Sequence, residues 1–197
     1  MSDDTPLDPL RRAHEEDFFH KRNQELIEKL RKKLAAEETA EGLKAATHLD
    51  DDELLQHLAR LGITQKTLPV LHLVPLLQVA WADGEIQAEE RILLEQAADE
   101  ANVEGEARAA FDDMLKNKPT QEFFDASLDF IRAMLAAMPA DRASAAKADL
   151  ESLAWRVADA AGGLFGLFGR VEGAEKGALQ DISARLSARS GKVLDRL

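Results

Sequence analysis

Apolar residues recur along most of the chain at intervals of three and four, the spacing that gathers side chains on one face of an α-helix. Glycines, prolines and capping residues separate these stretches. The pattern predicts helices over residues 10–41, 50–62, 70–82, 89–101, 105–116, 120–137, 140–161 and 172–186. No run of β-branched and aromatic residues alternates with polar ones, as a half-buried strand requires. We therefore predict an all-α fold, with a helical bundle preceded by a long N-terminal amphipathic helix.

The segment 70–82 is nearly all apolar, which predicts a central helix that is buried on most sides. We expect Thr67 to cap the start of this helix and Pro75 to kink it. Asp83 and Gly84 should end it, because an Asp-Gly pair favours a turn. The next helix resumes after this tight loop.

The first predicted helix is densely charged and carries a narrow apolar stripe. The stripe consists of Phe19, Leu26, Ile27, Leu30 and Leu34. It keeps a heptad for only about two turns on either side of Leu30, so a sustained coiled coil is not predicted. The stripe suits packing within the chain and packing against another chain equally well. Basic residues at positions 21, 22, 29 and 31–33 are diluted by Glu25 and Glu28, so we interpret them as a solvated helix face.

We divide the chain into an acidic tail and N-terminal amphipathic helix (1–45), a short connecting helix (46–66) and a helical domain (67–190). The polar, acidic opening lacks the basic and apolar regions of a secretory signal. No stretch approaches the roughly 18 apolar residues of a spanning helix. We therefore expect a cytoplasmic protein without a transmembrane segment.

The composition excludes much chemistry. The chain has no Cys, which rules out disulfides, thiolate metal sites and cysteine nucleophiles. Its formal net charge of −12 repels phosphate backbones, so we expect no nucleic-acid partner. The five His residues show no i,i+4 pair of the kind that binds zinc on a helix, and no Gly-x-Ser-x-Gly motif is present. We therefore expect that the protein is not an enzyme.

A degenerate internal repeat relates residues 79–90 to residues 157–162 and 171–176. Each copy has an apolar helix, a glycine break, a β-branched residue (Ile86 or Val171) and a carboxylate four residues later (Glu90 or Glu175). The second copy carries an insert at 163–170 and has Ala161 where the first copy has Asp83.

The segment Leu-Leu-Gln-Val-Ala-Trp-Ala-Asp-Gly-Glu-Ile at 76–86, with Glu-Glu-Arg at 89–91, resembles the TerB-like tellurite-resistance family. The later Ala-Gly-Gly-Leu-Phe-Gly at 161–166, with Val171 and Glu175, extends the resemblance over residues 68–186. Relatives of this family include the N-terminal cytoplasmic domain of a DnaJ-like membrane co-chaperone. The resemblance implies a helical bundle of two pseudo-symmetric halves, divalent metal at acidic helix breaks, and a role in stress responses without an established catalytic reaction.

Four carboxylates lie within eight residues at the first helix break. They are Asp83, Glu85, Glu89 and Glu90. Hard oxygen ligands of this kind suit Ca²⁺, Mg²⁺ or Mn²⁺. The site is not an EF-hand, because Val79 and Trp81 occupy positions that need oxygen side chains. We therefore treat the four carboxylates as a candidate divalent-cation site.

A structural interpretation of the same residues remains open. Asp83 would end its helix in a turn, while Gln87 and Glu90 form a capping box at the start of the next helix. Ala161 disfavours a site built symmetrically from both halves. Asp159, with Glu175 opposite, is the alternative that the second half offers.

The insert at 163–170 combines glycines with apolar side chains. These side chains are Leu164, Phe165, Leu167 and Phe168. They either tuck onto the bundle as a compact loop, with glycines allowing positive φ, or form an exposed loop that binds a protein partner or makes peripheral contact with a membrane.

The sequence favours a non-enzymatic stress-response protein that binds a divalent cation and acts as a sensor or adaptor. The alternative is a metal-independent protein–protein interaction module in a chaperone or membrane-associated stress complex. The identity of the cation, the protein partner and the oligomeric state are open at this stage.

Overall fold

The computed structural model describes residues 8–162 and 173–187, and every regular element in these ranges is a helix. The elements are α1 (Asp8–Thr47), α2 (Asp52–Arg60), the 3₁₀ helix η1 (Leu68–Leu73), α3 (Val74–Ala80), α4 (Ala88–Glu100), α5 (Gly105–Met114), α6 (Gln121–Ala137), α7 (Ala140–Gly162) and α8 (Gly173–Ser187). The predicted all-α class is confirmed.

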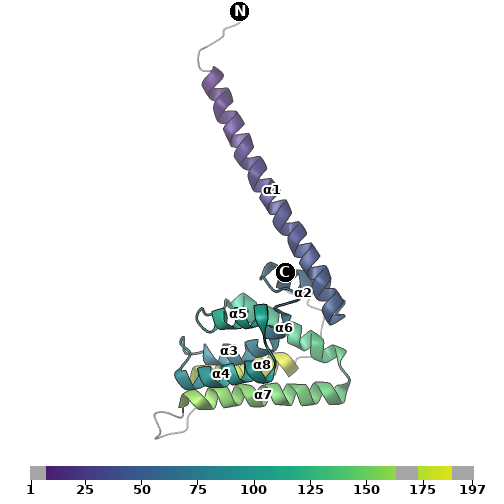
Figure 1. Cartoon of the computed structure of the whole chain (residues 1–197), viewed down its shortest axis with the longest axis vertical. Coiled ribbons are helices and arrows are strands. Elements are labelled where there is room, and N and C mark those ends of the chain that lie inside the picture. The colour runs from purple at the N-terminus through teal and green to yellow at the C-terminus, as the bar shows by residue number, and fades with distance from the viewer. Residues whose placement is uncertain (1–7, 163–172, 188–197) are drawn as a thin grey trace, which may run out of the picture.

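Helix α1 projects from the rest of the molecule (Figure 1). Within residues 21–47, the part of α1 whose burial is described, only the C-terminal end packs, where Ala40 and Leu43 are buried and α1 runs beside α2. Lys44 Nζ lies 2.9 Å from Asp52 Oδ1 and fastens this end to the first turn of α2. Residues 21–35 are exposed. The predicted amphipathic helix therefore protrudes over much of its length.

The apolar segment after Thr67 is buried as predicted, but its predicted course is wrong in one respect. It begins as the 3₁₀ helix η1, and the α-helical part starts only at Val74. Pro75 therefore lies in the first turn of α3 instead of kinking a helix interior. Proline suits this position because the N–H that it lacks would have no partner there. The Thr67 side chain does not cap η1; its hydroxyl accepts a hydrogen bond from Thr64 N at 2.9 Å.

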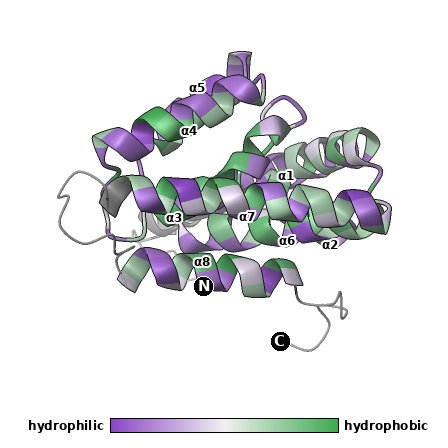
Figure 2. Cartoon of the chain, turned by 90° about the horizontal axis from the view of Figure 1, so that it is seen from below, coloured by the Kyte–Doolittle hydropathy of each residue, from purple (hydrophilic) through white to green (hydrophobic). Residues whose placement is uncertain are grey.

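Helix α3 lies in the centre and contacts α6, α7 and α8. Its residues Leu76, Leu77 and Val79 are fully or almost fully buried, and they share one core with Phe111 and Phe124. Figure 2 shows hydrophobic and hydrophilic residues alternating along α7 and α8, which is typical of helices that turn one face to a core.

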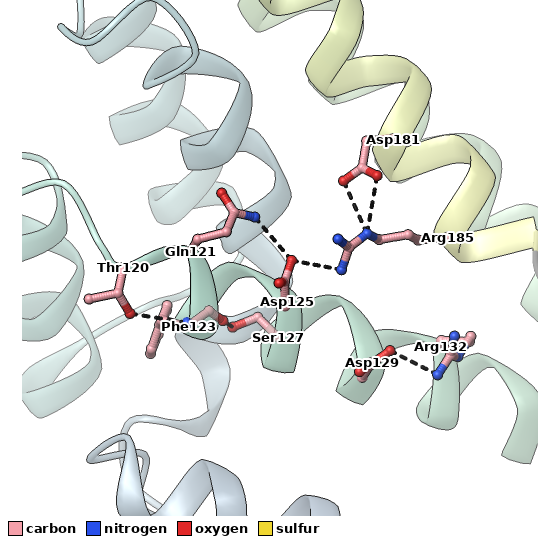
Figure 3. A network of polar contacts seen from close by, with 9 residues as sticks. All are labelled: Thr120, Gln121, Phe123, Asp125, Ser127, Asp129, Arg132, Asp181 and Arg185. Atoms are coloured by element: carbon pink, nitrogen blue, oxygen red, sulfur yellow. Dashed lines mark hydrogen bonds and ion pairs between the residues drawn. The ribbon is translucent and has the colours of Figure 1, made fainter. Parts of the chain in front are cut away.

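Helix α8 is fastened to α6 by an ionic network (Figure 3). Arg185 on α8 lies 2.7 Å from Asp125 on α6 and 3.1 Å from Asp181 on its own helix. Gln121 Nε2 donates a hydrogen bond to Asp125 at 3.0 Å. The network fixes α8 beside the core, and α8 carries Glu175, which matters for the site described next.

Candidate functional site

The break between α3 and α4 is a tight corner. Gly84 has a φ of +105°, which a residue with a side chain rarely adopts, and Glu85 N donates a hydrogen bond to Asp83 Oδ1 at 3.2 Å. At the start of α4, Gln87 N donates a hydrogen bond to Glu90 Oε2 at 2.8 Å. The predicted turn and the predicted capping box between Gln87 and Glu90 are confirmed.

Three side chains tie this corner to the end of α5. Trp81 Nε1 donates a hydrogen bond to Met114 O at 2.9 Å, and Arg91 donates one to Leu115 O at 2.9 Å. Lys118 Nζ donates to Trp81 O at 2.6 Å. The corner is therefore held from both of its helices by groups that lie more than 20 residues away in the sequence.

The four carboxylates predicted as metal ligands lie in different environments. Asp83 and Glu85 are exposed and Glu89 is half-buried, whereas only 1% of Glu90 is exposed. Glu175 on α8 is also buried, with 2% exposed. It lies close enough to Glu90 to raise the pKa of that carboxyl. We call Glu90 and Glu175 the carboxylate pair.

The pKa of Glu90 is raised to about 7, chiefly because burial disfavours the charged form. The Gln87 N–H opposes this shift by stabilising the carboxylate, while the charges of Glu175, Asp83 and Glu89 add to it. Within the described part of the chain, Glu90 Oε1 is buried without a hydrogen-bond partner. A buried oxygen of this kind is a binding position for a proton or a cation.

Asp83 and Glu89 thus lie within electrostatic range of Glu90, while Glu85 is not among the groups that raise its pKa. Asp159, the alternative ligand in the second half, is exposed on α7. Sequence analysis identified Glu175 as the counterpart of Glu90 in the repeat, but did not include it among the four candidate ligands. The signal was its spacing from Val171, which matches the spacing of Glu90 from Ile86.

Across residues 8–162 and 173–187, no three or more His, Asp or Glu side chains are grouped so that they hold a metal ion by themselves. The donor chemistry of the carboxylate pair nevertheless fits a hard cation, since both groups are buried and one oxygen has no hydrogen-bond partner in the described chain. Mg²⁺ is commonly bound by one or two carboxylates and keeps several waters, whereas Ca²⁺ takes six to eight oxygens. A site that offers only two carboxylates suits Mg²⁺ or Mn²⁺ better than Ca²⁺.

A second feature is an apolar groove between η1, α3, α4, α6 and α7, with a volume of about 520 Å³. Most of its lining is apolar, including Leu73, Met134, Leu135, Met138, Leu150 and Leu153. His72 also lines it, and burial lowers the pKa of this imidazole. The sequence pattern did not reveal the groove because its walls come from five separate elements. We call it the α6–α7 groove.

The predicted partner-binding residues Leu164, Phe165, Leu167 and Phe168 lie outside the described residues. Among the helices that the structure does describe, none combines the length and the apolar character needed to cross a bilayer.

Together, the fold and the site define an all-helical protein with a buried carboxylate pair at a helix–loop–helix corner and an apolar groove. No model of a known protein family matches the chain, and comparison with curated proteins and with solved structures gives no significant match.

Proposed function

We propose that this chain is a non-enzymatic, cytoplasmic, TerB-like stress-response protein that binds a divalent cation at the carboxylate pair and acts as a sensor or adaptor. The observation that carries the proposal is the burial of Glu90 and Glu175 in mutual electrostatic contact, with Glu90 Oε1 lacking a hydrogen-bond partner in the described chain. Two buried carboxylates repel each other, so a cation or a proton stabilises them.

The two glutamates occupy corresponding positions in the internal repeat, which supports the pseudo-symmetric arrangement that the TerB-like resemblance implies. One belongs to the first turn of α4 and the other to the first turn of α8. In the proposed site, Glu90 and Glu175 supply the inner ligands, Asp83 and Glu89 lie near them, and water completes the coordination.

The corner offers a route by which cation binding changes the rest of the molecule. Neutralising the carboxylate pair draws the start of α4 toward the start of α8. Trp81, Arg91 and Lys118 connect the same corner to the end of α5 and the loop before α6. Binding at the pair would therefore be transmitted to the end of α5 and the loop before α6, where a partner protein reads it.

The decisive experiment is a thermal-unfolding and NMR titration of metal-free protein with Mg²⁺, Mn²⁺, Ca²⁺ and Zn²⁺. A cation at 100 times its dissociation constant adds about 2.7 kcal/mol to the free energy of unfolding, which raises Tm by about 5–10 °C in a chain of this size. We expect this from Mg²⁺ or Mn²⁺, together with shifts of the amides around Gly84 and Glu175.

Matched variants locate the effect. Glu90→Gln and Glu175→Gln should each abolish the cation-dependent rise in Tm, whereas Glu85→Gln should retain it because this side chain is exposed. Cation affinity should also increase as pH rises through about 7, since the cation competes with the proton on Glu90. The proposal is wrong if no cation raises Tm, or if Glu90→Gln responds as the unchanged protein does.

A second candidate function is the metal-independent interaction module. The observation that favours it is the apolar stripe of α1, whose Leu26, Ile27, Leu30 and Leu34 are all at least half exposed. Comparing the partners captured with and without residues 1–45 tests it, and identical partner sets would count against a role for α1.

A further inference from the structure

Two apolar surfaces of this chain are left uncovered by the residues that the structure describes. One is the stripe on α1, where Leu26, Ile27, Leu30 and Leu34 are 51%, 50%, 59% and 63% exposed; we call these four residues the α1 stripe. The other is the α6–α7 groove, which offers about 520 Å³ of mostly apolar space. Neither surface belongs to the carboxylate pair, so the inference that follows is independent of the proposed function.

The two surfaces match in length. At 1.5 Å per residue, Leu26 and Leu34 lie about 12 Å apart along α1. The α7 wall of the groove extends from Ala146 to Leu153 and the α6 wall from Phe130 to Leu135 and on to Met138, so each is about 10–12 Å long by the same measure. Methionines in the lining adapt to the shape of an inserted side chain.

The two surfaces also match in charge. Residues 21–34 contain six basic and two acidic side chains, a net charge of +4, although the whole chain has a net charge of −12. At about 100° per residue, Arg22, Lys29 and Lys33 lie along one edge of the α1 stripe and Arg31 along the other. Glu25 and Glu28 fall on the opposite face of the helix. The stripe is thus bordered by positive charge on both sides.

The charged residues that line the groove are acidic. Glu100 on α4 and Asp149 on α7 are exposed and belong to its lining, which includes no Lys or Arg among the described residues. His72 also lines the groove, and partial desolvation lowers the pKa of its ring, which disfavours the charged form. An apolar helix face with basic edges therefore complements this groove in both hydrophobicity and charge.

The α1 stripe does not reach the groove of its own chain while α1 stays a continuous helix. The C-terminal end of α1 is held against α2 by Leu43 and by the Lys44–Asp52 ion pair, and the helix is continuous from Asp8 to Thr47. It directs residues 21–34 away from the groove-bearing body (Figure 1). Bringing the stripe to its own groove would require breaking α1. Side-by-side pairing of two α1 helices in parallel would place +4 next to +4, which is unfavourable.

We propose that the α1 stripe of one copy docks into the α6–α7 groove of a second copy, and that the reciprocal contact closes a two-fold symmetric homodimer. Closure by two identical contacts is the commonest symmetry of soluble homo-oligomers. The dimer covers both apolar surfaces at once and sets the basic edges of α1 against Glu100 and Asp149.

The first test measures the dimerisation constant of the full chain by sedimentation velocity over a range of protein concentrations. The stripe variant Leu30→Glu/Leu34→Glu should dimerise at least about tenfold more weakly, because charged side chains replace the inserted leucines. Its control is Lys21→Gln/Lys32→Gln, which makes the same change of two charge units on the exposed far side of α1 and should dimerise nearly as the unchanged chain does. The groove variant Ala146→Arg/Asp149→Lys, at exposed positions, should also dimerise at least about tenfold more weakly.

The second test mixes the two defective variants. The groove variant still has an intact α1 stripe and the stripe variant still has an intact groove. The mixture should therefore form a heterodimer through one intact contact, which binds more tightly than either variant alone, since neither homodimer has an intact contact. Increasing salt should weaken this heterodimer by screening the charged edges.

The remaining outcomes overturn the proposal. The first is a chain that stays monomeric at all concentrations, and the second is a mixture that forms no heterodimer. The third is a groove variant that dimerises normally while the stripe variant does not, which would indicate α1–α1 pairing. Anionic phosphatidylserine vesicles provide the last check. Stripe-dependent binding to the vesicles by a chain that remains monomeric in solution would assign α1 to membranes instead.

Discussion

At Glu90 the fold places a carboxyl group under two opposing influences. The start of helix α4 and the Gln87 N–H stabilise its charged form, while burial and the neighbouring carboxylates destabilise it. Burial dominates, and the pKa rises from 4.5 to about 7. The folded state therefore binds this proton more tightly than the unfolded state. The free energy of unfolding should decrease as pH increases from about 4.5 to about 7, by on the order of 2–3 kcal/mol.

Because the raised pKa of Glu90 lowers the free energy of unfolding at higher pH, it leads to a prediction for Glu90→Gln. The amide of this variant keeps the shape of the side chain and can still accept the hydrogen bond from Gln87 N. In the absence of divalent cations, the variant should be more stable than the unchanged chain at pH 8 by about 1–3 kcal/mol and nearly equal to it at pH 5. Urea unfolding at both pH values provides the measurement, and Glu89→Gln, at a half-buried neighbour, is the control. An unchanged pH dependence in Glu90→Gln would refute the assignment of the raised pKa to this carboxyl.

The candidate site shows what the sequence predicts about single residues and what it leaves undetermined. Proximity in the sequence predicted that Asp83, Glu85, Glu89 and Glu90 share a corner, and they do. It did not predict their burial, because successive helical residues point about 100° apart, so that Glu90 is buried while Glu89 is half exposed. Nor did it place Glu175 beside Glu90, since that contact depends on how α8 packs 85 residues later.

The helices themselves were predictable because their signals are local. Thr120 was predicted to start a helix, and its hydroxyl accepts a hydrogen bond from Phe123 N at 3.2 Å at the start of α6. The helix predicted over 120–137 does end at Ala137, two residues before Pro139, which disfavours a helical residue before it. The helix type of the segment after Thr67 was harder to predict, because a run that is apolar on every side has no periodicity to separate a 3₁₀ helix from an α-helix.

The contact between the α3–α4 corner and α5 yields a prediction about elements. Trp81→Phe keeps an aromatic ring but removes the donor to Met114 O and leaves a small cavity. It should lower the free energy of unfolding by about 1–3 kcal/mol. Trp155→Phe is a matched control, since that ring is 53% exposed and should change stability by less than about 0.5 kcal/mol. Chemical unfolding of both variants measures these free energies. Equal effects would mean that the hydrogen bond from Trp81 Nε1 to Met114 O does not hold the corner to α5.

At the scale of the whole molecule, the direction of α1 and the existence of the α6–α7 groove follow from packing among distant elements, and the sequence pattern left both open. The stripe on α1 was compatible with packing inside or outside the chain. Among residues 21–47 the structure buries α1 near its C-terminal end, at Ala40 and Leu43, and leaves residues 21–35 exposed. The body and residues 21–35 therefore differ in what stabilises them.

Hydrogen exchange should reveal this difference directly. Residues 21–35 are exposed and have no core contacts, and helical segments of about 12–15 residues are only marginally stable on their own, so their amides should exchange through local opening. Amides of α3 lie in the core and should exchange only through global unfolding, with protection many orders of magnitude higher. Measured by mass spectrometry in dilute protein, equally strong protection in both segments would show that α1 packs against the body. If α1 docks into a second copy, protection of residues 21–35 should rise with protein concentration in the unchanged chain and stay low in Leu30→Glu/Leu34→Glu, because only the dimer covers the stripe.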